Sequence, residues 1–155
     1  KRCARIFHVY RLIVSNRTRI PTIKTSSHTL DNYRLRSLSL LDNGFVELRN
    51  GRWSRSEEMI WGSLVLAVKG AALSKGHTLT DNDAIREYSY NLGTEYSDRQ
   101  IRDSFKSLDG FPDMVEKVME SGLRLDYIFM LLDDVAGAIE RLWDSINTEN
   151  TNSYQ

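Results

Sequence analysis

The sequence predicts an all-α fold, an up-and-down antiparallel bundle of five to six helices with an extended basic N-terminal arm. Apolar side chains recur every three or four residues through most of the chain after Leu30, which is the period of a helix buried on one side. Only two prolines occur in 155 residues, which excludes a Pro-rich disordered or collagen-like chain. A hydrophobic fraction of 41% is enough to fill a core, and the single cysteine, Cys3, excludes an internal disulfide framework.

Charge divides the sequence into an arm and a body. Residues 1–36 carry nine Lys or Arg and one Asp, a net +8, whereas residues 37–155 carry twelve bases and twenty acids, a net −8. We expect residues 1–28 to form a basic arm, either disordered or holding a short strand at Ile6–Val14, where β-branched and aromatic residues gather. Residues 29–147 are expected to form the helical body, and residues 148–155 a disordered polar tail.

Three interpretations of the arm remain open. In the first it is a passive solvated tail, or, because no Met begins the chain, a segment foreign to the native protein. In the second it packs against the body or a partner, and in the third it binds nucleic acid. His8 and Arg11 interrupt its apolar stretch, which argues against a signal peptide. No apolar run reaches the ~18 residues of a membrane span, so no membrane contact is expected.

The first expected helix begins near Leu30 and ends at Asn50-Gly51. Its apolar residues fall on one face, at spacings of three and four: Leu38, Leu41, Phe45 and Leu48. Gly44 lies inside this helix and costs about 1 kcal/mol relative to Ala.

The second helix is expected to be the central one. Ser54 and Glu57 have the spacing of a capping box, and Gly76 is suited to a left-handed stop after Lys75. Between these positions nearly every face is apolar, as in a helix buried on all sides. Four small residues permit close approach of neighbouring helices: Gly62, Ala67, Gly70 and Ala71. Lys69 is the exception, and we expect it to extend along the surface or to contact a ligand.

Three shorter segments follow. Thr80 and Ser97 are expected to cap the next two helices, and Gly93 is expected to end the first of them. A further short helix is predicted at Asp113–Glu120, with Gly122 breaking it.

The last helix has the most regular pattern. Seven apolar residues alternate at spacings of three and four: Leu125, Ile128, Leu132, Val135, Ile139, Leu142 and Ile146. Phe129, Ala136 and Trp143 widen this seam, so it suits a bundle helix that also dimerises. The expected dimer interface consists of Leu125, Ile128, Leu132, Val135 and Ile139.

Motifs for catalysis or metal binding are missing from the sequence. His8, His28 and His77 are scattered, without a Cys or carboxylate at ligand spacing. The adjacent Asp133 and Asp134 point to different faces of a helix, so they cannot act as a pair. No glycine-rich phosphate loop and no set of nucleophile, base and orienting group is visible. We therefore expect no metal, no cofactor and no catalytic residue.

A family resemblance is carried by the stretch Leu40–Phe45 and the following Arg52–Ala72. The second stretch follows the pattern E-x-x-W-G, then A-V-K-x-A, with these residues in order: Glu58, Trp61, Gly62, Ala67, Val68, Lys69 and Ala71. Over residues 35–146 the chain resembles archaeal PaREP-type helical proteins of the HEPN superfamily. The resemblance implies an up-and-down helical bundle, homodimeric and cytoplasmic.

Catalytic members of this superfamily are ribonucleases with an Arg followed four to six residues later by a His. No Arg in this sequence has a His at that offset, and the stretch after Arg99 and Arg102 continues as Lys106-Ser107-Leu108. Because the imidazole is the usual general base for the 2′-OH, we expect no ribonuclease activity. The residues expected to bind nucleotide or RNA are Lys69, Arg99 and Arg102.

We therefore expect a non-catalytic, HEPN-like helical binding module that forms a homodimer. Its ligand is a nucleotide, an RNA or a protein encoded by a neighbouring gene, as in toxin–antitoxin pairs. One alternative is a nucleic-acid-binding protein that acts through the basic arm. The other is a degenerate ribonuclease, which requires Lys69, Arg99 and Arg102 to converge on one cleft. That convergence would require a polar cleft between the Glu57–Lys75 and Arg99–Leu108 helices.

Overall fold

The computed structural model describes residues 23–122 and 124–152, and every regular element in them is a helix. The three long helices are α2 (Ile23–Arg49), α3 (Trp53–Ser74) and α8 (Asp126–Asn152). The shorter helices between them are α4 (Asn82–Glu95), α5 (Arg99–Arg102), α6 (Ser104–Asp109) and α7 (Phe111–Ser121). The all-α fold predicted from the spacing of apolar residues is confirmed.

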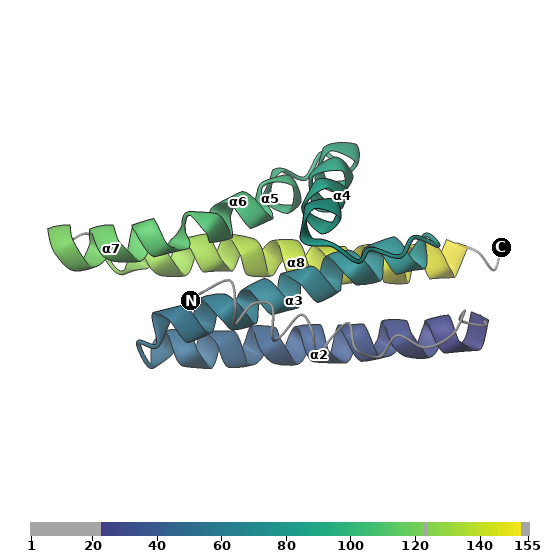
Figure 1. Ribbon diagram of the computed structural model, residues 1–155, viewed down its shortest axis with the longest axis horizontal. Coiled ribbons are helices and arrows are strands. Elements are labelled where there is room, and N and C mark those ends of the chain that lie inside the picture. The colour runs from purple at the N-terminus through teal and green to yellow at the C-terminus, as the bar shows by residue number, and fades with distance from the viewer. Residues whose placement is uncertain (1–22, 123, 153–155) are drawn as a thin grey trace.

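The rods of the bundle alternate in direction (Figure 1). α5, α6 and α7 are separated only by the single residues Asp103 and Gly110, and together they form one irregular rod against α8. α4 crosses the other helices at a steep angle (Figure 1). α3 contacts α2, α4, α6, α7 and α8, which makes it the central helix.

Two boundaries of the helical body differ from those expected. α2 begins at Ile23, so the arm expected at residues 1–28 is helical over its last residues. α8 continues to Asn152, so much of the tail expected at residues 148–155 is helical as well. Both helices extend because each added residue gains one hydrogen bond once a helix is nucleated. The strand expected at Ile6–Val14 lies outside the described residues.

α3 is buried on all sides, as its sequence predicts. Every residue from Ile60 to Ala72 is buried. Trp61 meets Phe105 of α6 edge-on, with the ring centroids 6.4 Å apart. Because apolar burial is the dominant favourable term in folding, α3 is the helix around which the others assemble.

A serine–tryptophan cluster joins α2, α3 and α8 inside this core. The Ser37 hydroxyl donates to the Ser63 carbonyl at 2.8 Å, and the Ser63 hydroxyl donates to the Ser37 carbonyl at 2.7 Å. Trp143 Nε1 donates to Ser37 Oγ at 2.9 Å. The Trp143 ring fits because Gly70 has no side chain, since an added Cβ would lie 2.4 Å from the ring. At Gly70, α3 therefore permits the close helix approach that the sequence predicts.

The start of α3 corrects the expected capping box. α3 begins at Trp53, with Arg52 in the cap position and no side chain capping the helix there. Ser54 therefore lies inside the first turn, and the box it was expected to form with Glu57 was misplaced. Arg52 instead forms an ion pair with Glu47 across the preceding turn, which fixes the path of the chain into the helix.

The next two helix starts are each displaced by one residue. Asp81, and not Thr80, caps α4 by accepting a hydrogen bond from a first-turn amide at 2.9 Å. Asp98, and not Ser97, caps α5 in the same way at 3.1 Å. Aspartate and the hydroxyl residues are comparable caps, so neighbouring candidates cannot be ranked by residue type alone.

Gly93 does not end α4, which continues to Glu95. It is the place where the α5 main chain comes closest, because an added Cβ would lie 2.2 Å from the Arg102 amide nitrogen. Gly76 and Gly122, with φ values of 82° and 65°, do follow helix ends as predicted.

Candidate functional site

A polar network joins the start of α5 to the exposed side of α8. Arg141 donates to both carboxylate oxygens of Asp98, from Nε at 2.6 Å and from Nη2 at 3.1 Å. The same Nη2 donates to Gln100 Oε1 at 2.6 Å, and Gln100 Nε2 donates to Asp134 Oδ1 at 3.0 Å. The Arg141 guanidinium lowers the pKa of the Asp98 carboxyl below its usual value. The network fixes α5 in position on α8.

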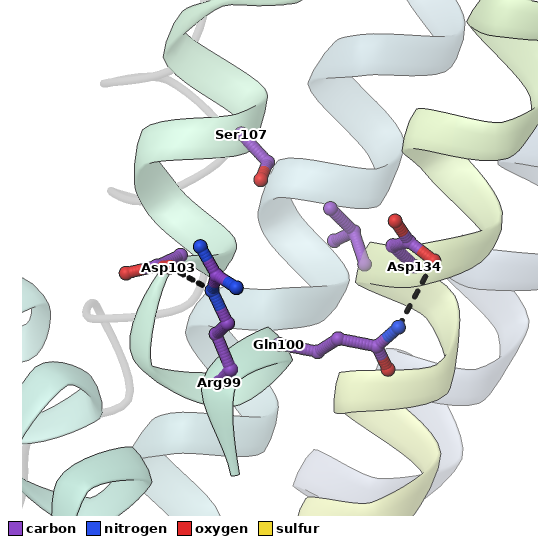
Figure 2. Close-up of a pocket in the computed structure, with 6 residues that line it drawn as sticks. Arg99, Gln100, Asp103, Ser107 and Asp134 are labelled. Atoms are coloured by element: carbon purple, nitrogen blue, oxygen red, sulfur yellow. Dashed lines mark hydrogen bonds and ion pairs between the residues drawn. The ribbon is translucent and has the colours of Figure 1, made fainter.

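A pocket of about 160 Å³ lies beside this network, between α5, α6 and α8 (Figure 2). The residues that line it are Arg99, Gln100, Asp103, Ser107, Asp134 and Val135. Figure 2 shows Arg99 paired with Asp103 on one wall and Gln100 reaching across to Asp134 of α8. The sequence pointed to a polar cleft between α3 and α5–α6, whereas this pocket faces α8.

The charges around the pocket are paired within the protein. Arg102 donates to both carboxylate oxygens of Asp103, from Nε and from Nη2, at 3.0 Å each. Arg99 Nε lies 3.8 Å from the same carboxylate, and these cations lower the pKa of Asp103. Asp134 adds a second negative charge to the lining. A phosphate would have to compete with Asp103 for both guanidinium groups, so the arrangement is poorly suited to holding an anion.

The pocket offers one hydroxyl, that of Ser107, as a nucleophile. His28 lies on α2 and His77 in the loop after α3, and neither lines the pocket, while His8 lies outside the described residues. Among the described residues, no imidazole lines the pocket beside this hydroxyl.

Of the three residues expected to bind nucleotide or RNA, Arg99 and Arg102 meet at Asp103, whereas Lys69 does not line the pocket beside them. Lys69 is only 7% exposed, and its Nζ lies 5.5 Å from the centre of the Tyr33 ring of α2. The expectation that Lys69 extends along the surface is wrong, because α2 packs over that side of α3. Arg99 lines the pocket, whereas Lys69 and Arg102 do not.

The expected dimer seam is the core of the single chain. Ile128, Leu132, Val135 and Ile139 are each at most 1% exposed and pack within the chain's own hydrophobic core. These four side chains are therefore not available to a partner, and only Leu125 of the expected interface is exposed, at 51%. A periodic stripe indicates that one face of a helix is covered, but not by which chain.

A different apolar surface is exposed where α7 connects to α8. Four large apolar side chains near this connection are exposed, by 69%, 51%, 47% and 60% respectively: Met119, Leu125, Tyr127 and Met130. They lie on both sides of Gly122, in the last turn of α7 and at or near the start of α8, and this surface is called the α7–α8 end below. Elsewhere the described residues expose three such side chains: Leu35, Val46 and Tyr90.

Among the described residues, no group of three or more His, Cys, Asp or Glu side chains is placed to hold a metal ion. None of the helices in that part of the chain combines the length and the hydropathy needed to cross a bilayer. No family model, no curated protein and no solved structure matches the chain.

Proposed function

We propose that this chain is a non-catalytic, HEPN-like helical binding module that forms a homodimer through its α7–α8 end. The observation that carries the proposal is that four of the seven large apolar side chains exposed by the described residues lie around one helix connection. Extended apolar surface on a small protein marks a contact site, since exposed apolar area is otherwise kept small.

The residue types at the α7–α8 end suit a protein contact. Tyr127 combines an apolar ring with a polar tip, and methionines such as Met119 and Met130 adapt their shape to a partner. Burial of one such side chain gives about 1.5–3 kcal/mol. Because these side chains are about half exposed, their combined burial on two protomers is of the same order as an association cost of roughly 4–15 kcal/mol.

The pocket supports the non-catalytic part of the proposal. Its charged groups are engaged with one another, through Arg102 with Asp103 and Gln100 with Asp134. A nucleotide would have to break these bonds, so we propose a protein partner in preference to a nucleotide. The alternating direction of the rods and the buried Trp61–Ala71 segment of α3 support the HEPN-like part.

Sedimentation equilibrium of paired variants tests the proposed dimer. Leu125→Asn with Met130→Asn is expected to weaken the homodimer at least about tenfold, because an amide is buried where an apolar group was. The matched control, Leu35→Asn with Val46→Asn, makes the same chemical change on exposed positions of α2 and is expected to leave the dimer unchanged. A monomeric native chain, or equal weakening by both pairs, would refute the proposal.

The non-catalytic part has its own test. We expect purified protein to leave a single-stranded RNA uncut. Turnover that disappears in Arg102→Ala, with the helical circular dichroism unchanged, would overturn this part and favour a degenerate ribonuclease.

A further inference from the structure

The α7–α8 end is acidic as well as apolar, and this combination indicates its occupant. We propose that it binds the basic segment formed by residues 1–22 of a second copy of the chain. The inference rests on the proposed function, because it names the partner of the same surface.

Exposed carboxylates are frequent along the two helices that meet at the α7–α8 end. Residues 111–135 contain six acids, all of them exposed: Asp113, Glu116, Glu120, Asp126, Asp133 and Asp134. The same stretch contains two bases, Lys117 and Arg124, so its net charge is −4. Arg124 is paired with Asp126 at 2.7 Å and Gln100 donates to Asp134, which leaves four acids in excess over Lys117: Asp113, Glu116, Glu120 and Asp133. A partner for this surface must therefore offer both apolar and positively charged side chains.

The segment of residues 1–22 has both properties. It contains six Lys or Arg and no acid, a net +6, and no other stretch of that length in the chain is as basic. Between its cations lie seven large apolar residues: Ile6, Phe7, Val9, Tyr10, Leu12, Ile13 and Val14. Opposite charges on two surfaces speed their encounter and select their register, while apolar burial supplies the affinity.

The length of the chain favours a second copy over the same copy. α2 has 27 residues and begins at the end of the bundle opposite the α7–α8 connection (Figure 1). It is therefore about 40 Å long at 1.5 Å per residue. Val14 precedes Ile23 by nine residues, which span at most about 30 Å when fully extended.

Val14 therefore cannot reach the α7–α8 end of its own chain, whereas Ile6, which precedes Ile23 by 17 residues, can lie up to about 60 Å away and can reach it, so only a part of the apolar stretch could bind within one chain. A second copy placed against that end has no such limit. Reciprocal binding of the two segments gives a closed dimer with two identical contacts.

Charge reversal in the full chain tests the inference. An arm-reversed variant carries four substitutions: Arg5→Glu, Arg11→Glu, Arg17→Glu and Arg19→Glu. A face-reversed variant carries three: Glu116→Lys, Glu120→Lys and Asp133→Lys. The control reverses three exposed acids on α2 and α4: Asp42→Lys, Glu87→Lys and Glu95→Lys. Circular dichroism and the thermal midpoint of each variant confirm that it is folded.

We expect arm reversal and face reversal each to weaken the homodimer at least about tenfold, because several ion pairs become repulsive. Combining both sets of changes is expected to restore the dissociation constant to within about threefold of native, since the charges are complementary again. The control variant is expected to change the dissociation constant of the homodimer by less than about threefold, because substitutions at exposed positions away from a contact have small effects.

Other outcomes overturn the inference in distinguishable ways. If arm reversal leaves the dimer intact while Leu125→Asn with Met130→Asn dissociates it, the proposed function stands and the arm is not the occupant. If neither change affects the dimer, both proposals fall. If arm reversal abolishes binding of a fluorescent single-stranded RNA without weakening the dimer, the arm is a nucleic-acid-binding segment.

Discussion

Replacing Gly93 by Ala tests how closely α4 lies on α5. Gly93 is buried, and a Cβ built on it would lie 2.2 Å from the Arg102 amide nitrogen and 2.5 Å from Arg102 Cα. These are main-chain atoms of a helix that Asp98 and Arg141 hold against α8. They cannot move aside as the end of a long side chain can, so the added methyl group must push α4 and α5 apart.

Two opposing effects set the size of the change at Gly93. Overpacking costs about 1–3 kcal/mol, and contact with main chain places this site near about 3 kcal/mol. Alanine is about 1 kcal/mol more favourable than glycine inside a helix, which offsets part of that cost. The unfolding free energy is therefore expected to fall by about 2 kcal/mol, and the thermal midpoint by about 4–8 °C.

Gly137→Ala in α8 is the matched control. The nearest atom to its added Cβ is Arg141 Nη1 at 3.0 Å, the end of a flexible side chain. Alanine again has the higher helix propensity, so the unfolding free energy of this variant is expected to be between equal to the native value and about 1 kcal/mol above it. Thermal unfolding followed by circular dichroism compares both with the native chain. A Gly93→Ala variant that melts at or above the native midpoint would refute the close α4–α5 packing. An equal fall of the midpoint in Gly93→Ala and Gly137→Ala would refute the explanation that a clash with main-chain atoms causes the loss.

Three further predictions concern the caps and the core. Arg141 holds the pKa of Asp98 below its unfolded value of about 3.9, so the stability from this pair is present above that pH and is lost as pH falls through the folded pKa. Asp98→Asn, which keeps the cap, should have a lower unfolding free energy than the native chain at neutral pH. As pH falls, its unfolding free energy should decrease less than that of the native chain, and an equal decrease in both would contradict this prediction. Trp143→Phe removes the N–H that donates to Ser37, and the unfolding free energy measured by urea denaturation should fall by about 1–3 kcal/mol. An unchanged unfolding free energy would argue against the buried Trp143–Ser37 hydrogen bond. Gly122→Ala places a Cβ on a residue with a φ of 65° and should cost about 1–2 kcal/mol by the same measurement, whereas an unchanged midpoint would show that the turn relaxes.

The helical architecture could be predicted because local periodicity carries it. The all-round apolar character of α3 indicates its central place, and the small residue Gly70 indicates a close neighbour. The helix starts could not be placed to the residue, because a hydroxyl and a carboxylate compete at adjacent positions, as Ser97 and Asp98 do. At α3 the residue in the cap position, Arg52, makes no side-chain cap and pairs with Glu47 across the preceding turn, so the hydroxyl of Ser54 marked the wrong position.

The candidate site could not be predicted for a related reason. Asp98 and Arg141 are separated by 43 residues, and nothing in either local sequence indicates that they meet. Arg99 was expected to bind nucleotide or RNA, but it pairs with Asp103 four residues later, a contact that the local spacing itself permits. Lys69 was expected at the surface because lysine is rarely buried, and its burial depends on the position of α2.

The α7–α8 end follows from helix geometry once the inward face of α8 is known. Ile128 is fully buried, and Met130 lies two residues later, about 200° around the helix, so it must face away from the core. Tyr127 lies three residues before Met130 and therefore shares its outward face. The start of α8 thus has two apolar faces, whereas Asp133 and Asp134 make the next outward turn polar.

Only one of these two faces is needed for folding, which allows the two roles to be separated. Ile128→Asn, on the inward face, is expected to cost several kcal/mol of stability and to abolish the dimer with the fold. Met130→Asn, on the outward face, is expected to change the unfolding free energy by less than about 0.5 kcal/mol while weakening the dimer. Urea unfolding of dilute monomer and sedimentation of concentrated protein measure the two effects independently. Equal losses of stability in both variants would mean that the outward face is part of the core, and the assignment of the α7–α8 end as a contact surface would fail.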